Sequence, residues 1–325
     1  MQNKYIISVD MGGTKILGSI INSKNGIIAR LKKPTNITTG TKTYVKDIAE
    51  IVLKLAQNSK LKKGNIAAVC LGVPGSVNPH TGIIGLAPNL GLKNFNMKSK
   101  LEKLIPYPVL IENDVNLGVL GIKNYGIGKS SNNMLAVFIG TGIGGGIIID
   151  GKIYRGKNFV AGEIGHMLVQ KDGPKCGCGR NGCFEAIASR TAMVNNIIND
   201  IKKGKKKSVL SGLVKSNLRI KSGALREAID AGDKVVIKRI TETCVTIGDV
   251  LASVTNLMNF DMIVLGGGVI EALESFILPI IKKEFQNHVL DDSAKGIKIV
   301  ASKLGDDVAI YGGIALAEEF LGVRV

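Results

Sequence analysis

One segment of the 325-residue chain, residues 163–185, gathers most of the side chains that could bind a metal ion. It reads EIGHMLVQKDGPKCGCGRNGCFE, and its candidate ligands are His166, Cys176, Cys178 and Cys183. One imidazole with three thiolates is a set that holds zinc tetrahedrally. The glycines and lysines around these cysteines would make a poor hydrophobic core, so a structural zinc site is favoured over a chance cluster of buried cysteines. Glu163 and Glu185 bracket the set and, as harder ligands, remain available for other contacts.

A second kind of chemistry is indicated by a glycine-rich turn near the N-terminus. The apolar run at 4–9 predicts a buried strand that reaches Asp10, and the runs at 16–21 and 27–31 predict two further strands joined by an Asn-Gly turn. The turn between the first two strands carries Asp10, Gly12, Gly13, Thr14 and Lys15. Adjacent glycines let the backbone approach a phosphate group. The Walker A spacing is absent, and a glycine hairpin without a ligand remains the alternative.

The chain then repeats this order of elements. A strand is predicted at 134–139, followed by a turn at 140–145 that contains Thr141 and Gly142, a strand at 147–149 and an Asp-Gly turn. Two matching units predict a duplicated domain with two phosphate-binding turns and a nucleotide between them. A triple glycine at 266–268, between a strand at 262–265 and a helix, suits close approach of a base or ribose, or is only a tight turn.

Asp114 has two possible roles on position alone. A strand at 108–111 leads into Glu112, Asn113 and Asp114, and an apolar helix is predicted at 115–125. Ligands of open α/β sheets bind beyond the carboxyl ends of the strands. Asp114 is therefore either the N-cap of the helix or a functional carboxylate.

Net charge, aromatic content and the length of apolar runs indicate which partners the protein can have. The net charge of +17 invites a nucleic-acid partner, but the lysines are scattered and the only dense run is at 202–207. Aromatic residues make up 4% with no tryptophan, so stacking platforms for nucleic acid are scarce. No run approaches the roughly 20 apolar residues of a membrane helix, and no signal-peptide region precedes Asp10. We expect a cytoplasmic protein with reduced thiols and no membrane or nucleic-acid partner.

Seven motifs resemble the ROK family (repressors, open reading frames and sugar kinases) of the actin-like ATPase superfamily. They are DMGGTK at 10–15, GVPG at 72–75, ENDVN at 112–116, GTGIGGG at 140–146, EIGH at 163–166, CGCGRNGCFE at 176–185 and LGGGV at 265–269. The resemblance implies an α/β fold of duplicated actin-like (ribonuclease H-like) domains with a nucleotide and sugar cleft. The implied domains are 1–115, joined by the helix at about 308–325, and 116–307 with the zinc motif.

The resemblance also implies an activity. It is that of an ATP-dependent hexose kinase, most like bacterial glucokinases, with Asp114 as the base for the C6 hydroxyl of glucose. The alternatives are an N-acylhexosamine kinase, for N-acetylmannosamine or N-acetylglucosamine, and a sugar-responsive repressor. Repressor members carry a helix-turn-helix ahead of the first phosphate turn, and the nine residues before Asp10 are expected to form a strand instead. A homodimer or homotetramer is expected.

Individual roles follow from the matched motifs. The implied sugar contacts are Gly75, Asn89, Asn113, Asp114, Glu163, His166 and Glu185. The implied contacts to ATP and Mg²⁺ are Asp10, Gly12, Gly13, Thr14, Lys15, Thr141, Gly142, Gly267 and Gly268, with Asp10 near the metal. His166 would bind structural zinc through one ring nitrogen and the sugar through the other.

Overall fold

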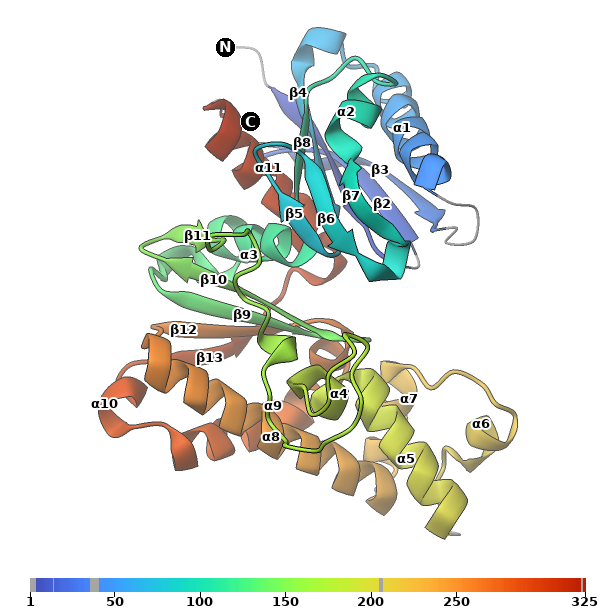
Figure 1. Cartoon of the computed structure of the whole chain (residues 1–325), viewed down its shortest axis with the longest axis vertical. Helices are drawn as coiled ribbons and strands as arrows, with labels where there is room; N and C mark the ends of the chain where they lie inside the picture. Colours follow the sequence, from blue (N-terminus) through green and yellow to red (C-terminus); the bar gives the residue numbers. More distant parts are fainter. Residues whose placement is uncertain (1–3, 14, 36–40, 205–206, 323) are drawn as a thin grey trace. The chain divides into compact units, whose positions relative to one another are not determined.

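The computed structural model describes residues 4–13, 15–35, 41–204, 207–322 and 324–325 (Figure 1). These residues fall into two compact units by the density of their contacts. Unit 1 comprises residues up to 130, 146–161 and 306–325, and unit 2 comprises 131–145 and 162–305. The division into functional domains at residues 115 and 116 stays a prediction.

A five-stranded mixed sheet forms the centre of unit 1, in the order β3-β2-β1-β4-β8. Its strands are β1 (Tyr5–Met11), β2 (Lys15–Asn22), β3 (Gly26–Pro34), β4 (Ile66–Val73) and β8 (Val109–Asn113). The first three strands form an antiparallel meander, whereas β4 pairs parallel with both β1 and β8. The central strands β1 and β4 are buried along nearly their whole length, which is why they read as continuous apolar runs.

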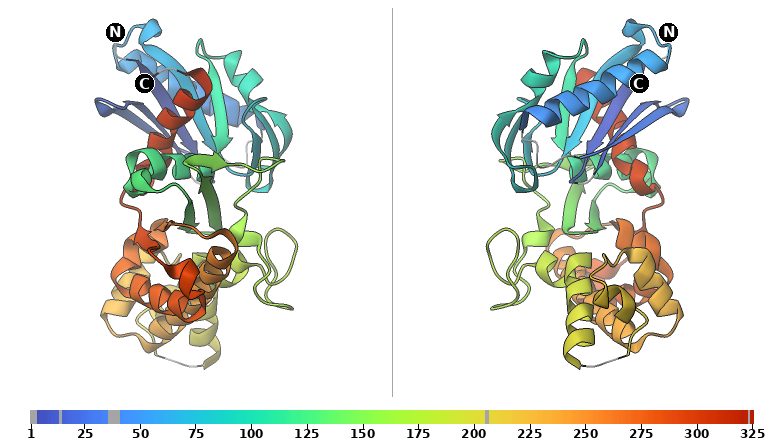
Figure 2. Two further views of the ribbon diagram at one scale, coloured as in Figure 1. Left: turned by 90° about the vertical axis from the view of Figure 1, so that its left-hand side faces the viewer. Right: turned by 90° about the vertical axis from the view of Figure 1, so that its right-hand side faces the viewer.

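Helices cover both faces of this sheet. One face packs on α1 (Thr41–Asn58) and α2 (Met97–Glu102), and the other packs on α3 (Asp114–Tyr125) and α11 (Val308–Leu321) (Figures 1 and 2). The helices α3 and α11 approach closely because glycines face each other. A Cβ on Gly121 would lie 2.0 Å from the carbonyl oxygen of Val308, and one on Gly312 would lie 1.7 Å from that of Leu117.

A second five-stranded sheet has the order β11-β10-β9-β12-β13. Its strands are β9 (Met134–Ile139), β10 (Ile143–Ile149), β11 (Lys152–Tyr154), β12 (Met262–Gly266) and β13 (Lys298–Ala301). Two hairpin strands stand at one edge, and β12 pairs parallel with β9 and β13. This is the strand arrangement of the first sheet, as the repeated motifs predict.

Seven helices complete the described part of unit 2. They are α4 (Phe184–Ala188), α5 (Arg190–Gly204), α6 (Ser211–Lys215), α7 (Ser222–Asp230), α8 (Lys234–Met258), α9 (Gly268–His288) and α10 (Asp291–Ala294). Short 3-10 helices occur at Lys63–Asn65, Pro88–Leu90, Ile127–Ser130, Ile164–His166 and Gly305–Asp307. None of the helices among the described residues is long and apolar enough to span a bilayer.

Two local predictions differ from the structure. The region predicted as loops around Gly75 and Asn89 contains a small antiparallel sheet of β5 (Ser76–Asn78), β6 (Ile83–Ala87) and β7 (Leu92–Asn96). These strands are short, and glycine or asparagine interrupts their apolar residues, so they show no alternation. The sequence at 186–199 predicts a single helix, but the structure has two helices there, because Ser189 adopts an extended conformation and its hydroxyl caps α5 by accepting the N–H of Ala192.

Candidate active site and metal-binding segment

The junction of β8 and α3 shows which residue caps the helix. The N-cap of α3 is Asn113, whose Oδ1 accepts the N–H of Asn116 at 3.0 Å. Asp114 is the first helical residue, and its Oδ1 accepts the N–H of Val115 at 3.0 Å. The N-cap alternative for Asp114 is therefore wrong. Its carboxylate lies in the first turn of a 12-residue helix, where the helix dipole favours negative charge.

A second carboxylate, that of Asp10, lies near Asp114. Asp10 is in β1 and pairs across to Gly72 in β4, which in turn pairs with Glu112 in β8. A Cβ on Gly72 would lie 3.4 Å from Cα of Asp114 and 3.7 Å from Oδ1 of Asp10, so a glycine leaves the space between them open. The pKa of Asp10 is raised to about 7, mainly by burial and next by the charge of Asp114, while the charge of Lys15 opposes the shift. Two acids thus converge beyond the carboxyl ends of parallel strands, which suits a bound cation.

The first glycine turn connects β1 and β2. The N–H of Gly12 donates to the carbonyl of Lys15 at 2.9 Å, and the Lys15 ammonium forms an ion pair with Asp306. A Cβ on Gly13 would meet no atom within 4 Å, so this side of the turn is open. Thr14, which is part of the predicted phosphate site, lies outside the described residues.

The second glycine turn connects β9 and β10 and is held by side chains of unit 2. Arg190 donates to Oγ1 of Thr141 at 2.7 Å, and the Thr191 hydroxyl donates to the Thr141 carbonyl at 2.7 Å. Glu185 Oε2 accepts the N–H of Ile143 at 2.9 Å. A Cβ on Gly142 would lie 2.1 Å from that carboxylate oxygen. The turn therefore needs glycine at position 142 so that Glu185 can bind its backbone.

The four predicted metal ligands come together. Their ligand atoms all lie within 4.8 Å of one another. Cys178 Sγ and Cys183 Sγ are 3.7 Å apart, and Cys176 Sγ is 3.8 Å from His166 Nδ1. Ligand atoms bound about 2.3 Å from a tetrahedral zinc ion lie roughly 3.8 Å from each other, so the set fits zinc. Burial raises the pKa of Cys176 to about 12 and also raises that of Cys183, and a metal ion would have to displace both protons.

Predicted sugar-binding side chains surround this set of ligands. His166 Nε2 is 3.9 Å from Glu163 Oε2, while Nδ1 of the same ring faces Cys176. The thiol of Cys176 also donates to Glu185 Oε1 at 3.8 Å. Between the 3-10 helix at Ile164–His166 and α4 the segment runs as an extended loop without a helix or a multi-residue strand (Figure 2). The ligand set therefore holds together both ends of the 163–185 segment.

The triple-glycine turn requires its middle residue. Gly267 has a φ of +90°, and a Cβ there would lie 2.7 Å from the carbonyl oxygen of Ile139. Gly268 is the first residue of the 21-residue helix α9. The predicted nucleotide contact is thus a helix N-terminus, where backbone N–H groups favour negative ligand groups.

The predicted residues are distributed over both units. Unit 1 contains Asp10, Gly12, Gly13, Lys15, Gly75, Asn89, Asn113 and Asp114, and unit 2 contains Thr141, Gly142, Glu163, His166, Glu185, Gly267, Gly268 and the cysteines. Within unit 1, Asn113 Nδ2 donates to the Gly75 carbonyl at 3.0 Å. The Asn113 side chain thus uses both its oxygen and its nitrogen within the protein.

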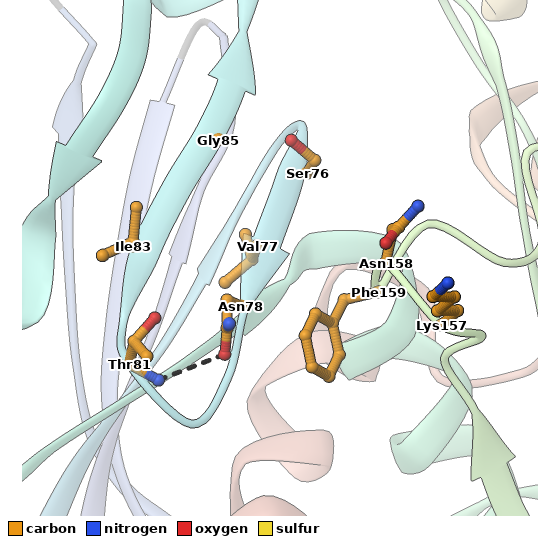
Figure 3. Close-up of a pocket in the computed structure, with 9 residues that line it drawn as sticks. All are labelled: Ser76, Val77, Asn78, Thr81, Ile83, Gly85, Lys157, Asn158 and Phe159. Carbon is orange, nitrogen blue, oxygen red and sulfur yellow. Dashed lines mark hydrogen bonds between the residues drawn. The ribbon is translucent and has the colours of Figure 1, made fainter.

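A pocket that sequence reasoning missed lies beside β5 and β6 (Figure 3). It has a volume of about 350 Å³, and polar groups of the hairpin face Lys157, Asn158 and Phe159 across it. Asn78 Oδ1 accepts the N–H of Thr81 at 3.2 Å and shapes the hairpin end. Sequence pattern did not predict the hairpin, because residues 76–87 have the composition of a loop.

Arg155 was also missed. Glu112 follows three apolar residues of β8 and is 1% exposed, and Arg155 donates to it at 2.6 Å. The available signal was Glu112 itself, because a carboxylate in a buried strand requires a cationic or hydrogen-bonding partner. The sequence does not say which cation provides it.

Comparisons with known proteins agree with the motifs. A curated glucokinase from Halalkalibacterium halodurans is 32% identical over 314 residues, which cover 96% of this chain and 94% of that protein. A crystal structure of a ROK family glucokinase from Streptomyces griseus, in complex with glucose and AMPPNP, matches with a TM-score of 0.84 at 30% identity and covers 97% of this chain and 99% of that one. A xylose repressor from Caldicellulosiruptor bescii is 28% identical over 312 residues, or 96% of this chain and 77% of that protein.

The comparisons of sequence and of structure thus identify proteins of the same family. The two mixed α/β sheets are consistent with the actin-like ATPase fold, and the chain has the ROK sugar kinase fold. The model of the ROK family matches residues 6–320, and the chain belongs to that family.

Proposed function

We propose that this ROK protein is an ATP-dependent hexose kinase that phosphorylates the C6 hydroxyl of glucose. The observation that carries the proposal is the convergence of Asp10 and Asp114 beyond the strand ends of unit 1, with Gly72 leaving the space between them open. One carboxylate would act as a base for the sugar, and the other would lie near the magnesium that is bound with ATP. The resemblance to curated and structurally solved glucokinases supports the choice of sugar.

In the proposed reaction Asp114 accepts one proton. The C6 oxygen attacks the γ-phosphorus, the bond from the γ-phosphorus to the β–γ bridging oxygen breaks, and the hydroxyl proton passes to Asp114. The products are glucose 6-phosphate and ADP. A carboxylate suits this task because the transition state is loose and the proton leaves late. Magnesium, when bound with ATP near Asp10, would neutralise charge on the phosphate oxygens.

The sugar would be held by side chains that do not react. We assign this role to Asn113, Glu163, His166 and Glu185, with the loops of Gly75 and Asn89 nearby. Because both ends of the Asn113 side chain already bind the protein, its sugar contact requires one of these bonds to be shared or exchanged.

Zinc would act as a scaffold in this site. The four ligands fill a tetrahedral shell and leave no position for water, so the metal would not act as a Lewis acid. With Nδ1 of His166 facing the thiolates, Nε2 remains directed away from them toward Glu163. The metal would thereby fix the tautomer and direction of the imidazole.

ATP would be bound by the repeated elements. The two glycine turns, at 12–15 and 140–142, would bind phosphates, and Gly267 and Gly268 would approach the adenosine. The equal strand order of the two sheets supports a duplicated actin-like architecture with domains at 1–115 and 116–307.

A panel of purified sugars tests the proposal. The protein is incubated with Mg²⁺, ATP and one sugar at a time, and ADP release and the phosphorylated product are measured. Glucose should give the highest kcat/KM with the phosphate on C6. Turnover of N-acetylmannosamine or N-acetylglucosamine but not of glucose would identify an N-acylhexosamine kinase instead.

A second candidate function is that of a sugar-responsive repressor, which the similarity to a xylose repressor favours. It predicts no turnover with any sugar together with tight, salt-sensitive binding to a specific duplex. The same sugar panel and a DNA-binding titration separate the two candidates.

A further inference from the structure

A buried ion pair involves Glu112, two residues before the proposed base Asp114. Glu112 immediately precedes Asn113 in β8, and its side chain is 1% exposed. Nε of Arg155, which follows β11 and is 13% exposed, donates to Glu112 Oε2 at 2.6 Å. A buried carboxylate that loses its only cationic partner is strongly destabilised. The position of Glu112 therefore depends on Arg155.

Arg155 is itself fixed from two other directions. Its two terminal nitrogens donate to the two carboxylate oxygens of Glu319 in α11, at 2.7 and 2.9 Å. Its Cζ lies 5.7 Å from the ring centroid of Phe320. A planar guanidinium can satisfy these directions at once, whereas an ammonium group cannot.

The second oxygen of Glu112 reaches the first turn of α3. Oε1 accepts the N–H of Asn113 at 2.9 Å and Nδ2 of Asn116 at 3.2 Å. Asn113 in turn caps α3 through the N–H of Asn116. Asp114 lies between these two residues, so hydrogen bonds to Glu112 hold the backbone of Asn113 on one side of it and the side chain of Asn116 on the other.

We propose that Arg155 is a positioning residue for the reaction: it fixes Glu112, which fixes the Asn113–Asn116 turn and hence the direction of the Asp114 carboxylate. This inference rests on the proposed function, because it takes Asp114 as the base. In this role Arg155 acts through Glu112 and not on the substrate. Its removal should leave the base present but misdirected.

The test compares Arg155→Met with Arg155→Lys and with a matched ion-pair variant, Arg239→Met. Arg239 also binds two acids, Asp200 at 2.7 and 2.9 Å and Glu242 at 2.8 Å, but it joins α8 to α5 and neither acid is a predicted site residue. Turnover and KM for glucose are measured together with the thermal unfolding midpoint of each variant.

The three variants should separate positioning from folding stability. Arg155→Met should lower kcat about 100-fold with KM for glucose changed by less than about threefold, because a small misplacement of a reacting group costs rate rather than binding. Arg155→Lys should lose about 10-fold. Arg239→Met should lower the unfolding midpoint and leave kcat within about twofold.

A double variant gives a readout that a purely structural role would not change. Glu112→Gln combined with Arg155→Met removes the unpaired charge but keeps an acceptor for Asn113, so kcat should recover at least about fivefold over Arg155→Met. If Arg155→Met does not fold, Arg155→Lys and Glu319→Gln answer the same question, each with a loss of kcat at unchanged KM.

Wild-type kcat in folded Arg155 variants, or a loss no larger than that of Arg239→Met, would overturn the inference. Asp114→Asn is measured in the same assay. An active Asp114→Asn enzyme contradicts the proposed base, whereas an inactive one beside a fully active Arg155→Met contradicts only the role of Arg155.

Discussion

The two glycine turns occupy equivalent places in two sheets of the same strand order, but they have different surroundings. The first turn, between β1 and β2, follows Asp10 and places Lys15 beside Asp306. The second, between β9 and β10, is held by Glu185 and Arg190, which come from later segments of unit 2. The first copy of the turn is thus preceded by an acidic residue, Asp10, whereas the second copy is held by Glu185 and Arg190 from later in the sequence.

This difference shows how one architecture can serve two tasks. In unit 1 the turn begins beside two converging carboxylates, and the pKa of Asp10 is raised by burial and by the charge of Asp114. In unit 2 the Glu185 carboxylate makes two contacts. It accepts a backbone N–H of the turn, and it also accepts a hydrogen bond from Cys176, one of the four metal ligands. Substitution of a metal ligand should therefore change the conformation of the second turn and leave that of the first turn unchanged.

Among the changes that distinguish the two turns, loss of the metal should have the largest effect. The wild-type protein, purified without chelators, should contain about one zinc ion per chain by elemental analysis. Cys178→Ser should lose the metal and weaken glucose binding about 100-fold by calorimetry, because Glu163, His166 and Glu185 lose their common anchor. Cys244→Ala, at a buried cysteine of α8 outside the ligand set, is the control and should keep both. A zinc-free protein with unchanged glucose affinity would contradict the scaffold role.

A smaller effect is expected from a methyl group on the second turn. Gly142→Ala places its Cβ against Glu185, 2.1 Å from Oε2, so it should lower kcat/KM about 10- to 100-fold and stability by roughly 1–3 kcal/mol. Gly140→Ala, whose Cβ would meet no atom within 4 Å, should leave the unfolding free energy of the nucleotide-free protein unchanged. Equal unfolding midpoints for the two variants would show that Glu185 does not hold the turn.

The smallest predicted effect tests the first turn through its pKa. The folded-state pKa of Asp10 is raised from 3.8 to about 7, so its ionisation opposes folding, and this loss of stability grows as pH rises and is complete above pH 7. Without Mg²⁺ and nucleotide, Asp10→Asn should raise the unfolding midpoint by roughly 3–6 °C at pH 8 and much less at pH 4. A shift of the same size at both pH values would contradict the raised pKa.

Long periodic segments could be predicted from the sequence. The strand at 134–139 has the predicted bounds, and the helix predicted at about 308–325 runs from 308 to 321, because each has a sustained apolar pattern that its packing preserves. The strands β5, β6 and β7 could not be predicted, since asparagine, glycine or lysine interrupts the few apolar residues of these short segments.

The metal ligands and the ion pair show the same limit for the site. His166 and the three cysteines lie within 18 residues of one another, so their spacing alone predicted the cluster. Glu112 and Arg155 are 43 residues apart, and their pairing depends on the placement of β8 relative to the segment after β11. Local pattern contains no information of that kind.

The measurement that tests the central claim most directly is single-turnover phosphoryl transfer by Asp114→Asn, with glucose binding measured on the same sample. If Asp114 is the base, transfer should fall by about 100- to 10,000-fold, while glucose affinity stays within about threefold because the amide keeps the shape of the side chain. Transfer at the wild-type rate, with glucose bound as before, would contradict the account.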